Sequence, residues 1–246
     1  MLIKALTALA TAAIVPAQAA PSGQTAMDLH VAAASDDAPR VATLVKHGVP
    51  VDAIVHEGVT PLMTAASNNA AVSARKLVEL KADVNRRTAA GWTALLYAAE
   101  TGSVSALDVL LDAKADVHAV LAGGESALVQ SCFRRHPRAA HRLIDTDIDV
   151  DRSSAIGLTA LLVCADAGFE DVVRRLIEKK ANVNAANQYG ETALMRAALR
   201  GHLGVVKQLV AAGADKDARD RQGRTAQDWA RANGHVEVSR VLSGRL

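Results

Sequence analysis

A glycine recurs every 33 residues along this chain, and this spacing constrains the fold more than any other feature. A hydroxyl residue follows each glycine two positions later, and apolar residues at helical spacing come next. A fixed period of this length indicates stacked units that each pack only on their neighbours. One elongated domain is therefore expected instead of two globular ones. The glycines are Gly58, Gly91, Gly124, Gly157, Gly190 and Gly223.

Each unit is predicted to contain two helices. In the clearest unit, Thr192 lies where a helix N-cap is expected, and Gly201 interrupts the helical pattern before a second apolar run begins. A leucine recurs in the first helix of the internal units, and small residues two turns later allow close approach of neighbouring helices. The leucines are Leu62, Leu95, Leu128, Leu161 and Leu194.

These units resemble ankyrin repeats, whose signature opens with T-P-L-H. The openings of the five internal units read GVTPLMTAAS, GWTALLYAAE, GESALVQSCF, GLTALLVCAD and GETALMRAAL. The resemblance implies an all-α ankyrin-repeat solenoid of stacked helix-turn-helix units with hairpin loops. The usual histidine of the signature is absent from these five units, which carry Met63, Leu96, Val129, Leu162 and Met195.

The end repeats are expected to depart from the consensus because their outer faces meet water. The first repeat lacks the glycine, and Leu29 and Gly48 set its register. In the last repeat, Gln227 and Asp228 replace the core leucine and its neighbour, which suggests a polar cap. The expected repeats are 25–57, 58–90, 91–123, 124–156, 157–189, 190–222 and 223–246.

The N-terminus has the features of a secretory signal peptide over residues 1–19, followed by a linker over 20–24. Lys4 precedes a short apolar run, and Ala17-Gln18-Ala19 matches an A-x-A cleavage site. The run is shorter than the roughly 20 apolar residues that span a bilayer. We therefore predict cleavage after Ala19 or Ala20, export to the periplasm or medium, and no transmembrane segment in the mature protein.

Composition and motifs argue against several function classes. The formal net charge is +2, which is too small to suggest a nucleic-acid binder. No phosphate-binding glycine loop, H-E-x-x-H or G-x-S-x-G motif is present. We therefore expect neither catalysis nor a cofactor. His202 and His235 hold the same position in successive repeats, where a structural role is favoured over metal binding.

Cys132 and Cys164 lie at similar positions on the first helices of adjacent repeats. An exported compartment favours oxidation. However, packed helices lie about 8 to 10 Å apart, whereas a disulfide needs Cα atoms within about 7 Å. Two buried thiols are therefore the favoured interpretation, and a disulfide is the alternative. Cys132 and His136 also have a C-x3-H spacing, but no further metal ligand is nearby.

The fourth repeat departs from its neighbours. Arg135 stands where the other internal repeats have glycine or asparagine, within a basic cluster over 133–142, and four aspartates follow over 145–151. A solvated face with balanced charges is the favoured interpretation. A salt-sensitive docking patch for an acidic partner segment is the alternative.

The ankyrin resemblance also implies where a partner would bind. In that family the concave face is built by the hairpin tips and the C-terminal ends of the first helices. Three of the six aromatic residues of the chain fall in this register with several charges, and Trp, Tyr and Arg are frequent hot spots. The predicted protein-binding residues are Trp92, Glu100, Glu125, Phe133, Arg134, Tyr189, Arg200 and Arg224.

These observations predict an exported, non-catalytic scaffold that binds a protein or peptide on its concave face. Resemblance to exported bacterial ankyrin proteins suggests a factor that supports an envelope or oxidative-stress enzyme. An immunity protein that neutralises a toxic enzyme is an alternative. Alternatives of other classes are a metal or thiol site at Cys132, Cys164 and His136, and a self-associating structural protein.

Overall fold

The computed structural model describes residues 25–244, so the expected signal peptide and linker lie outside the described residues. Within this range the chain forms fourteen α-helices in seven consecutive pairs. A single 3-10 turn, η1, covers His56–Gly58. The helices are α1 Ala26–Ala34, α2 Ala38–Lys46, α3 Pro61–Ser67, α4 Ala71–Glu79, α5 Ala94–Thr101, α6 Val104–Asp112, α7 Ala127–Phe133, α8 Pro137–Ile144, α9 Ala160–Ala167, α10 Glu170–Glu178, α11 Ala193–Arg200, α12 Leu203–Ala211, α13 Ala226–Ala232 and α14 Val236–Leu242.

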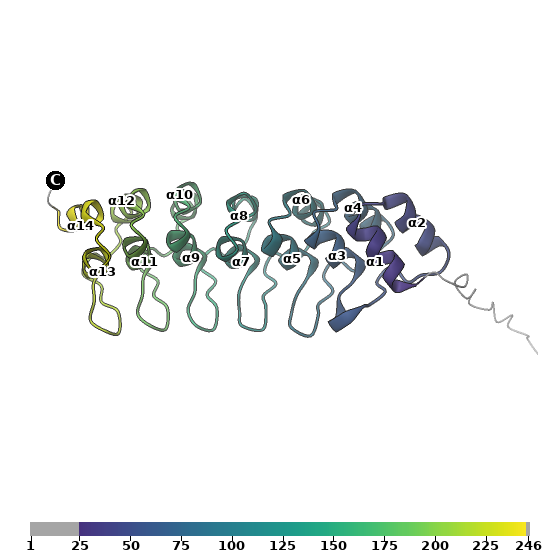
Figure 1. Cartoon of the computed structure of the whole chain (residues 1–246), viewed down its shortest axis with the longest axis horizontal. Coiled ribbons are helices and arrows are strands. Elements are labelled where there is room, and N and C mark those ends of the chain that lie inside the picture. Colours follow the sequence, from purple (N-terminus) through teal and green to yellow (C-terminus); the bar gives the residue numbers. More distant parts are fainter. Residues whose placement is uncertain (1–24, 245–246) are drawn as a thin grey trace, which may run out of the picture.

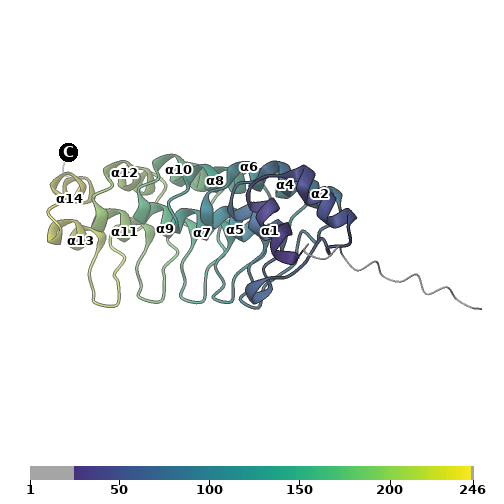
Figure 2. The same cartoon turned by 45° about the vertical axis from the view of Figure 1, so that its right-hand side comes forward.

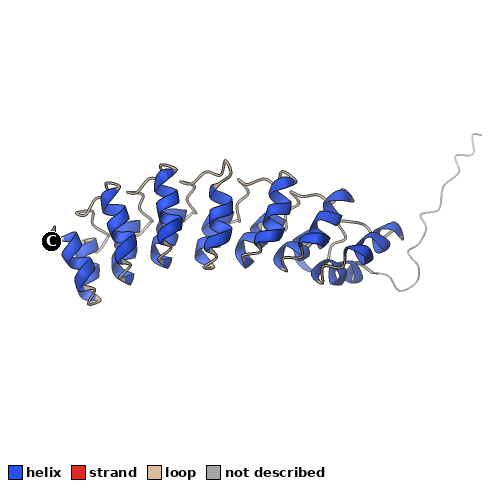
Figure 3. Ribbon diagram, turned by 90° about the horizontal axis from the view of Figure 1, so that it is seen from above, coloured by secondary structure: helices blue, strands red, loops and turns tan. Residues whose placement is uncertain are grey.

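The pairs stack into an elongated, layered solenoid, as the ankyrin resemblance predicts (Figures 1 and 2). The odd-numbered helices form one row and the even-numbered helices a second row, and each helix contacts its equivalents in adjacent pairs. The loops between pairs project together from the side of the odd-numbered row (Figure 1). Figure 3 shows the same stacking from above. Within residues 25–244, no helix is both long and apolar enough to cross a membrane.

The start of each first helix is fixed by its cap. The side-chain oxygens of Thr93, Ser126 and Thr159 accept hydrogen bonds from backbone amides in the first turn. Thr60 and Thr192 do the same in their helices. Each such cap stabilises a helix by about 1 kcal/mol, so the hydroxyl residue after each glycine has the predicted role.

The core lies between the two helix rows and continues from one end of the solenoid to the other. The predicted leucine ladder is entirely buried, with Leu62, Leu128 and Leu194 at 0% exposure. Buried alanines beside these leucines let the helices of adjacent repeats approach closely. Because every repeat buries its apolar side against a neighbour, a single repeat has no core of its own.

The hairpin loops are joined by backbone hydrogen bonds from tip to tip. Ala155 donates to Gly123 at 2.8 Å, Gln188 to Ile156 at 3.0 Å, and Arg221 to Tyr189 at 2.9 Å. The recurring glycines lie in this contact. An added Cβ on Gly157 would come within 2.8 Å of the Asn187 Cα in the next hairpin. The glycine spacing therefore reflects a positive φ angle and close approach of two backbones.

His30 occupies the position in the first repeat that the histidine of the T-P-L-H signature has in ankyrin repeats. The sequence alone did not single it out. Its ring is buried, with Nδ1 2.7 Å from the Thr64 hydroxyl and Nε2 2.9 Å from the Ala53 carbonyl. Burial lowers the pKa of His30, although the bond to Ala53 opposes this shift. His30 therefore ties the first repeat to the second as a neutral ring.

We expect acid to destabilise the first repeat through His30. The pKa of His30 in the folded protein is below its unfolded value of about 6.5. The neutral ring therefore stabilises the fold fully above pH 6.5. This stabilisation is lost as the pH falls through the folded pKa. Urea unfolding at pH 7.5 and pH 5 should show a smaller acid-induced loss in a His30→Gln variant than in the wild type. An equal loss in both proteins would contradict this role.

Candidate binding surface

Three register positions in each repeat combine to form one surface. The residue directly after the repeat glycine lies at the end of the hairpin. The sixth and ninth residues after the same glycine lie one turn apart on the first helix. Their contacts show that they face the same way. Trp92 stacks on Tyr97 with ring centroids 4.8 Å apart, and Arg224 lies over the Trp229 ring at 3.7 Å.

The Trp92–Tyr97 pair borders a cleft of about 620 Å³ between the second and third repeats. Glu57 and Thr88 line the same cleft from two successive hairpins. Both aromatic rings are partly buried against the core. The pair is therefore a fixed aromatic surface beside an open space.

A second pocket of about 240 Å³, with a mixed polar and apolar lining, lies between the fourth and sixth repeats. Phe133 and Tyr189 contribute to its lining, together with Leu158, Leu162 and Val163. Phe133 is 62% exposed and Tyr189 is 50% exposed, so both residues leave half or more of their surface in water. Large exposed aromatics beside a pocket are typical of binding surfaces.

Ion pairs between repeats organise the charges around this pocket. Asp166 accepts from Arg196 at 2.9 Å and from Arg200 at 3.0 Å. Arg196 also reaches Glu191 at 3.5 Å, and Glu100 pairs with Arg134 in the preceding repeats. The acidic groups at this pocket are thus already neutralised by arginines.

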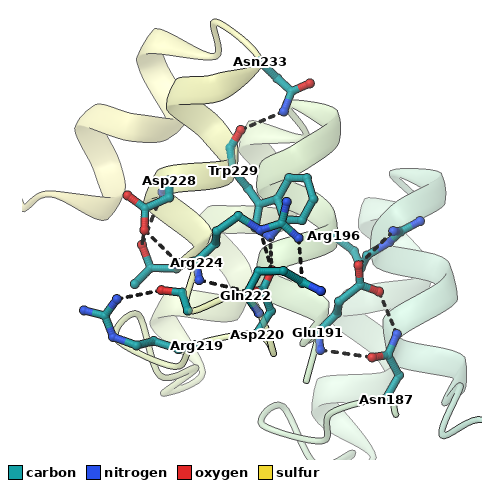
Figure 4. Close-up of polar contacts among 12 residues, drawn as sticks. Asn187, Glu191, Arg196, Arg219, Asp220, Gln222, Arg224, Asp228, Trp229 and Asn233 are labelled. Atoms are coloured by element: carbon teal, nitrogen blue, oxygen red, sulfur yellow. Dashed lines mark hydrogen bonds and ion pairs between the residues drawn. The ribbon is translucent and has the colours of Figure 1, made fainter. Parts of the chain in front are cut away.

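At the C-terminal end of the surface, a buried carboxylate holds the last hairpin (Figure 4). Asp220 accepts from the Arg224 guanidinium at 2.9 Å and from the Trp229 indole at 3.1 Å. Burial by itself would raise the pKa of Asp220, but bonds from Arg224 and from the Gln222 amide hold this pKa below its ordinary value. Arg224 is therefore engaged within its own hairpin.

The structure brings most of the predicted binding residues onto this surface. Trp92 lines the first cleft, and Phe133 and Tyr189 line the second pocket. Glu100 and Arg134 pair with each other, and Arg200 joins Asp166. The Glu125 carboxylate lies against Gly123 of its own hairpin.

Sequence reasoning missed Tyr97 and Arg196, which both lie six residues after their glycine. Tyr97 forms the stack with Trp92, and Arg196 bridges Asp166 and Glu191. The signal was present, because a position one helical turn before the ninth residue shares its face. Trp229 holds the equivalent position in the last repeat.

The expectation of two buried thiols is wrong, because the structure joins Cys132 and Cys164 in a disulfide with their Cα atoms 5.1 Å apart. The average spacing of packed helices did not apply at this point, because small buried residues such as Ala99 and Ala165 line the first helices and allow a closer approach. Neither sulfur is a thiolate in this structure. Within residues 25–244, no three His, Cys, Asp or Glu side chains are grouped as metal ligands, and the His136 ring packs under Gly102.

Charges of the basic cluster and of the following aspartates in the fourth repeat pair with neighbouring repeats. Arg142 bonds Asp108 at 2.6 Å, and Arg175 bonds Asp145 at 2.8 Å. Arg135 adopts a φ of 68° in the glycine position, donates to the Ala167 carbonyl, and lies over the Phe169 ring. These contacts agree with a solvated, internally balanced face, while the docking-patch alternative stays a prediction.

Comparison with known proteins gives the class of protein that this fold and surface define. The family model for ankyrin repeats in three copies matches residues 29–120, 114–187 and 180–245. The chain therefore belongs to the ankyrin-repeat family. Curated protein sequences gave no match.

Two solved structures resemble the chain over most of its length. The ankyrin repeat domain of human ASB11 is 28% identical with a TM-score of 0.76, and the match covers 89% of this chain and 97% of that one. The ankyrin repeat domain of Bcl-3, a member of the IkappaB protein family, is 27% identical with a TM-score of 0.73, covering 87% and 97%. Ankyrin repeats are in general non-catalytic scaffolds for protein–protein interaction.

Proposed function

We propose that this protein is an exported scaffold that binds a protein or peptide partner on the surface formed by its hairpins and first helices. The observation that carries the proposal is the exposure of Phe133 and Tyr189 beside a pocket on that surface. Trp92 supplies a third aromatic group on the same face. These residues anchor the partner, and Glu100, Glu125, Arg134 and Arg200 orient it.

The export part of the proposal rests on the signal-like residues 1–19 and gains support from the disulfide. Structural disulfides persist in oxidising compartments such as the periplasm and are rare in the cytosol. The Cys132–Cys164 bond therefore fits an exported protein. N-terminal sequencing of exported material tests this part, because an intact Met1 on mature soluble protein would contradict it.

Substitution of two anchors should abolish capture of the natural partner. Trp92→Ala and Tyr189→Ala should each weaken binding by about 2 kcal/mol, because large aromatic anchors dominate interface energies. If the effects add, the double variant binds about a thousand-fold more weakly. Pull-down of the partner, followed by affinity measurement by calorimetry, measures the effect.

Val236→Ala is the matched control, because Val236 is 63% exposed on α14, in the second-helix row. It should bind as the wild type does. Undiminished binding by a well-folded double variant would place the partner on another face.

The nature of the partner follows from its activity once it is captured. We propose an envelope or oxidative-stress enzyme that the scaffold supports, so adding the purified scaffold should preserve or raise enzyme activity. A fall in activity would instead identify an immunity protein.

A further inference from the structure

The cleft beside Trp92 and Tyr97 differs from the Phe133–Tyr189 pocket in its free charge. Glu57 lines this cleft directly, and Glu100 lies one helical turn after Tyr97 on α5. Glu100 is already paired with Arg134. Among residues 25–244, no cation pairs with Glu57, whose side chain is at the solvent surface.

The carboxylates of Glu57 and Glu100 lie close enough to the aromatic pair to raise the pKa of Tyr97. Burial raises the pKa of Tyr97, and the negative charges of Glu100 and Glu57 raise it further. No described residue hydrogen-bonds the Tyr97 hydroxyl, which leaves this group free to contact a ligand. The cleft therefore combines two stacked aromatic rings, a negative potential and an unpaired carboxylate.

We propose that this cleft binds an arginine or lysine side chain of the partner, with the cation against Trp92 and Tyr97 and its charge facing Glu57. The inference rests on the proposed function and specifies the chemistry of one contact. A cation over an aromatic face gains about 0.5 to 2 kcal/mol, and an opposite charge adds specificity. An acidic side chain would meet Glu57 unfavourably, and an apolar one would leave Glu57 without a partner.

The other pocket supports this assignment by contrast. Its acidic residues, Asp166 and Glu191, are both paired with Arg196, and its lining includes Leu158, Leu162 and Val163. That pocket therefore offers no unpaired acid to a cation. The surface accepts a basic side chain toward its N-terminal end, whereas the acids toward its C-terminal end are already paired.

The test uses defined peptides. NMR titration follows the indole N–H signal of Trp92, which is assigned by its absence from the spectrum of a Trp92→Phe variant. The titrants are acetyl-Gly-Gly-Arg-Gly-Gly-amide and the same peptide with norleucine in place of arginine. The arginine peptide should shift the Trp92 signal saturably and bind about ten-fold more tightly than the norleucine peptide. Raised salt should weaken only the arginine peptide.

Glu57→Gln should remove most of this preference while keeping the side-chain shape. Glu178→Gln on α10 removes an equal charge on the second-helix row and should leave the preference unchanged. Equal binding of both peptides, binding of neither, or an unchanged preference in Glu57→Gln would each overturn the inference. If one of these results is obtained but the natural partner still requires Trp92 and Tyr189, the proposed function stands. Only the proposed contact with a basic side chain is then rejected.

Discussion

Replacing Gly157 with alanine should lower the free energy of unfolding by about 3 kcal/mol. The glycine has a φ of 79°, where an L-residue costs about 1 to 2 kcal/mol. An added Cβ would also lie 2.8 Å from the Asn187 Cα in the next hairpin. Backbone atoms at that distance have to move, and such overpacking costs about 1 to 3 kcal/mol more. Urea unfolding measures the loss.

Gly223→Ala separates the two contributions. Gly223 holds the same register position with a φ of 77°, but nothing lies within 4 Å of its added Cβ because no repeat follows in the described structure. The variant should lose only the conformational part, about 1 to 2 kcal/mol. Equal losses in the two variants would show that contact between hairpins contributes nothing.

Loss of the Cys132–Cys164 disulfide should lower the free energy of unfolding by about 3 to 4 kcal/mol. The bond closes a loop with a sequence separation of 32 residues, and loop-closure entropy gives this magnitude. Urea unfolding of a Cys132→Ala/Cys164→Ala variant measures the effect. Alanine fills the equivalent positions in other repeats, at Ala99 for Cys132 and at Ala197 for Cys164, so the substitution leaves packing nearly intact.

Reduction provides the internal control for the disulfide. Dithiothreitol should lower the unfolding midpoint of the wild type and leave that of the double alanine variant unchanged. Detection of two reactive thiols after unfolding without reductant would contradict the disulfide.

The fold follows from the sequence because its determinants are local and repeated. The recurring glycine, the hydroxyl cap and the leucine ladder each appear several times, so one irregular repeat such as the fourth does not hide the pattern. His30 was missed although Leu29 sets the register of the first repeat, because the sequence does not show which groups the ring meets. Its partners, Thr64 and Ala53, come from the following loop and repeat.

The candidate surface was only partly accessible from the sequence. Register alone selected Trp92, Phe133 and Tyr189, but it could not show that the Arg224 guanidinium is held by Asp220. Whether a charged residue is free or paired depends on side-chain conformations, and in pairs such as Arg134 with Glu100 also on how adjacent repeats pack together. The disulfide was misjudged for a similar reason, because an average helix spacing does not describe the closest point between two helices.

Backbone hydrogen bonds between the hairpin tips allow the binding specificity of this surface to change during evolution without loss of its structure. Ile156 and Tyr189 project from loops whose main chains are bonded to a neighbouring loop. The row of hairpin loops is held together by hydrogen bonds between peptide groups, so its structure does not depend on which side chains the loops carry. Exposed residues can therefore be exchanged individually to suit a new partner, and little ordering entropy is lost when that partner binds.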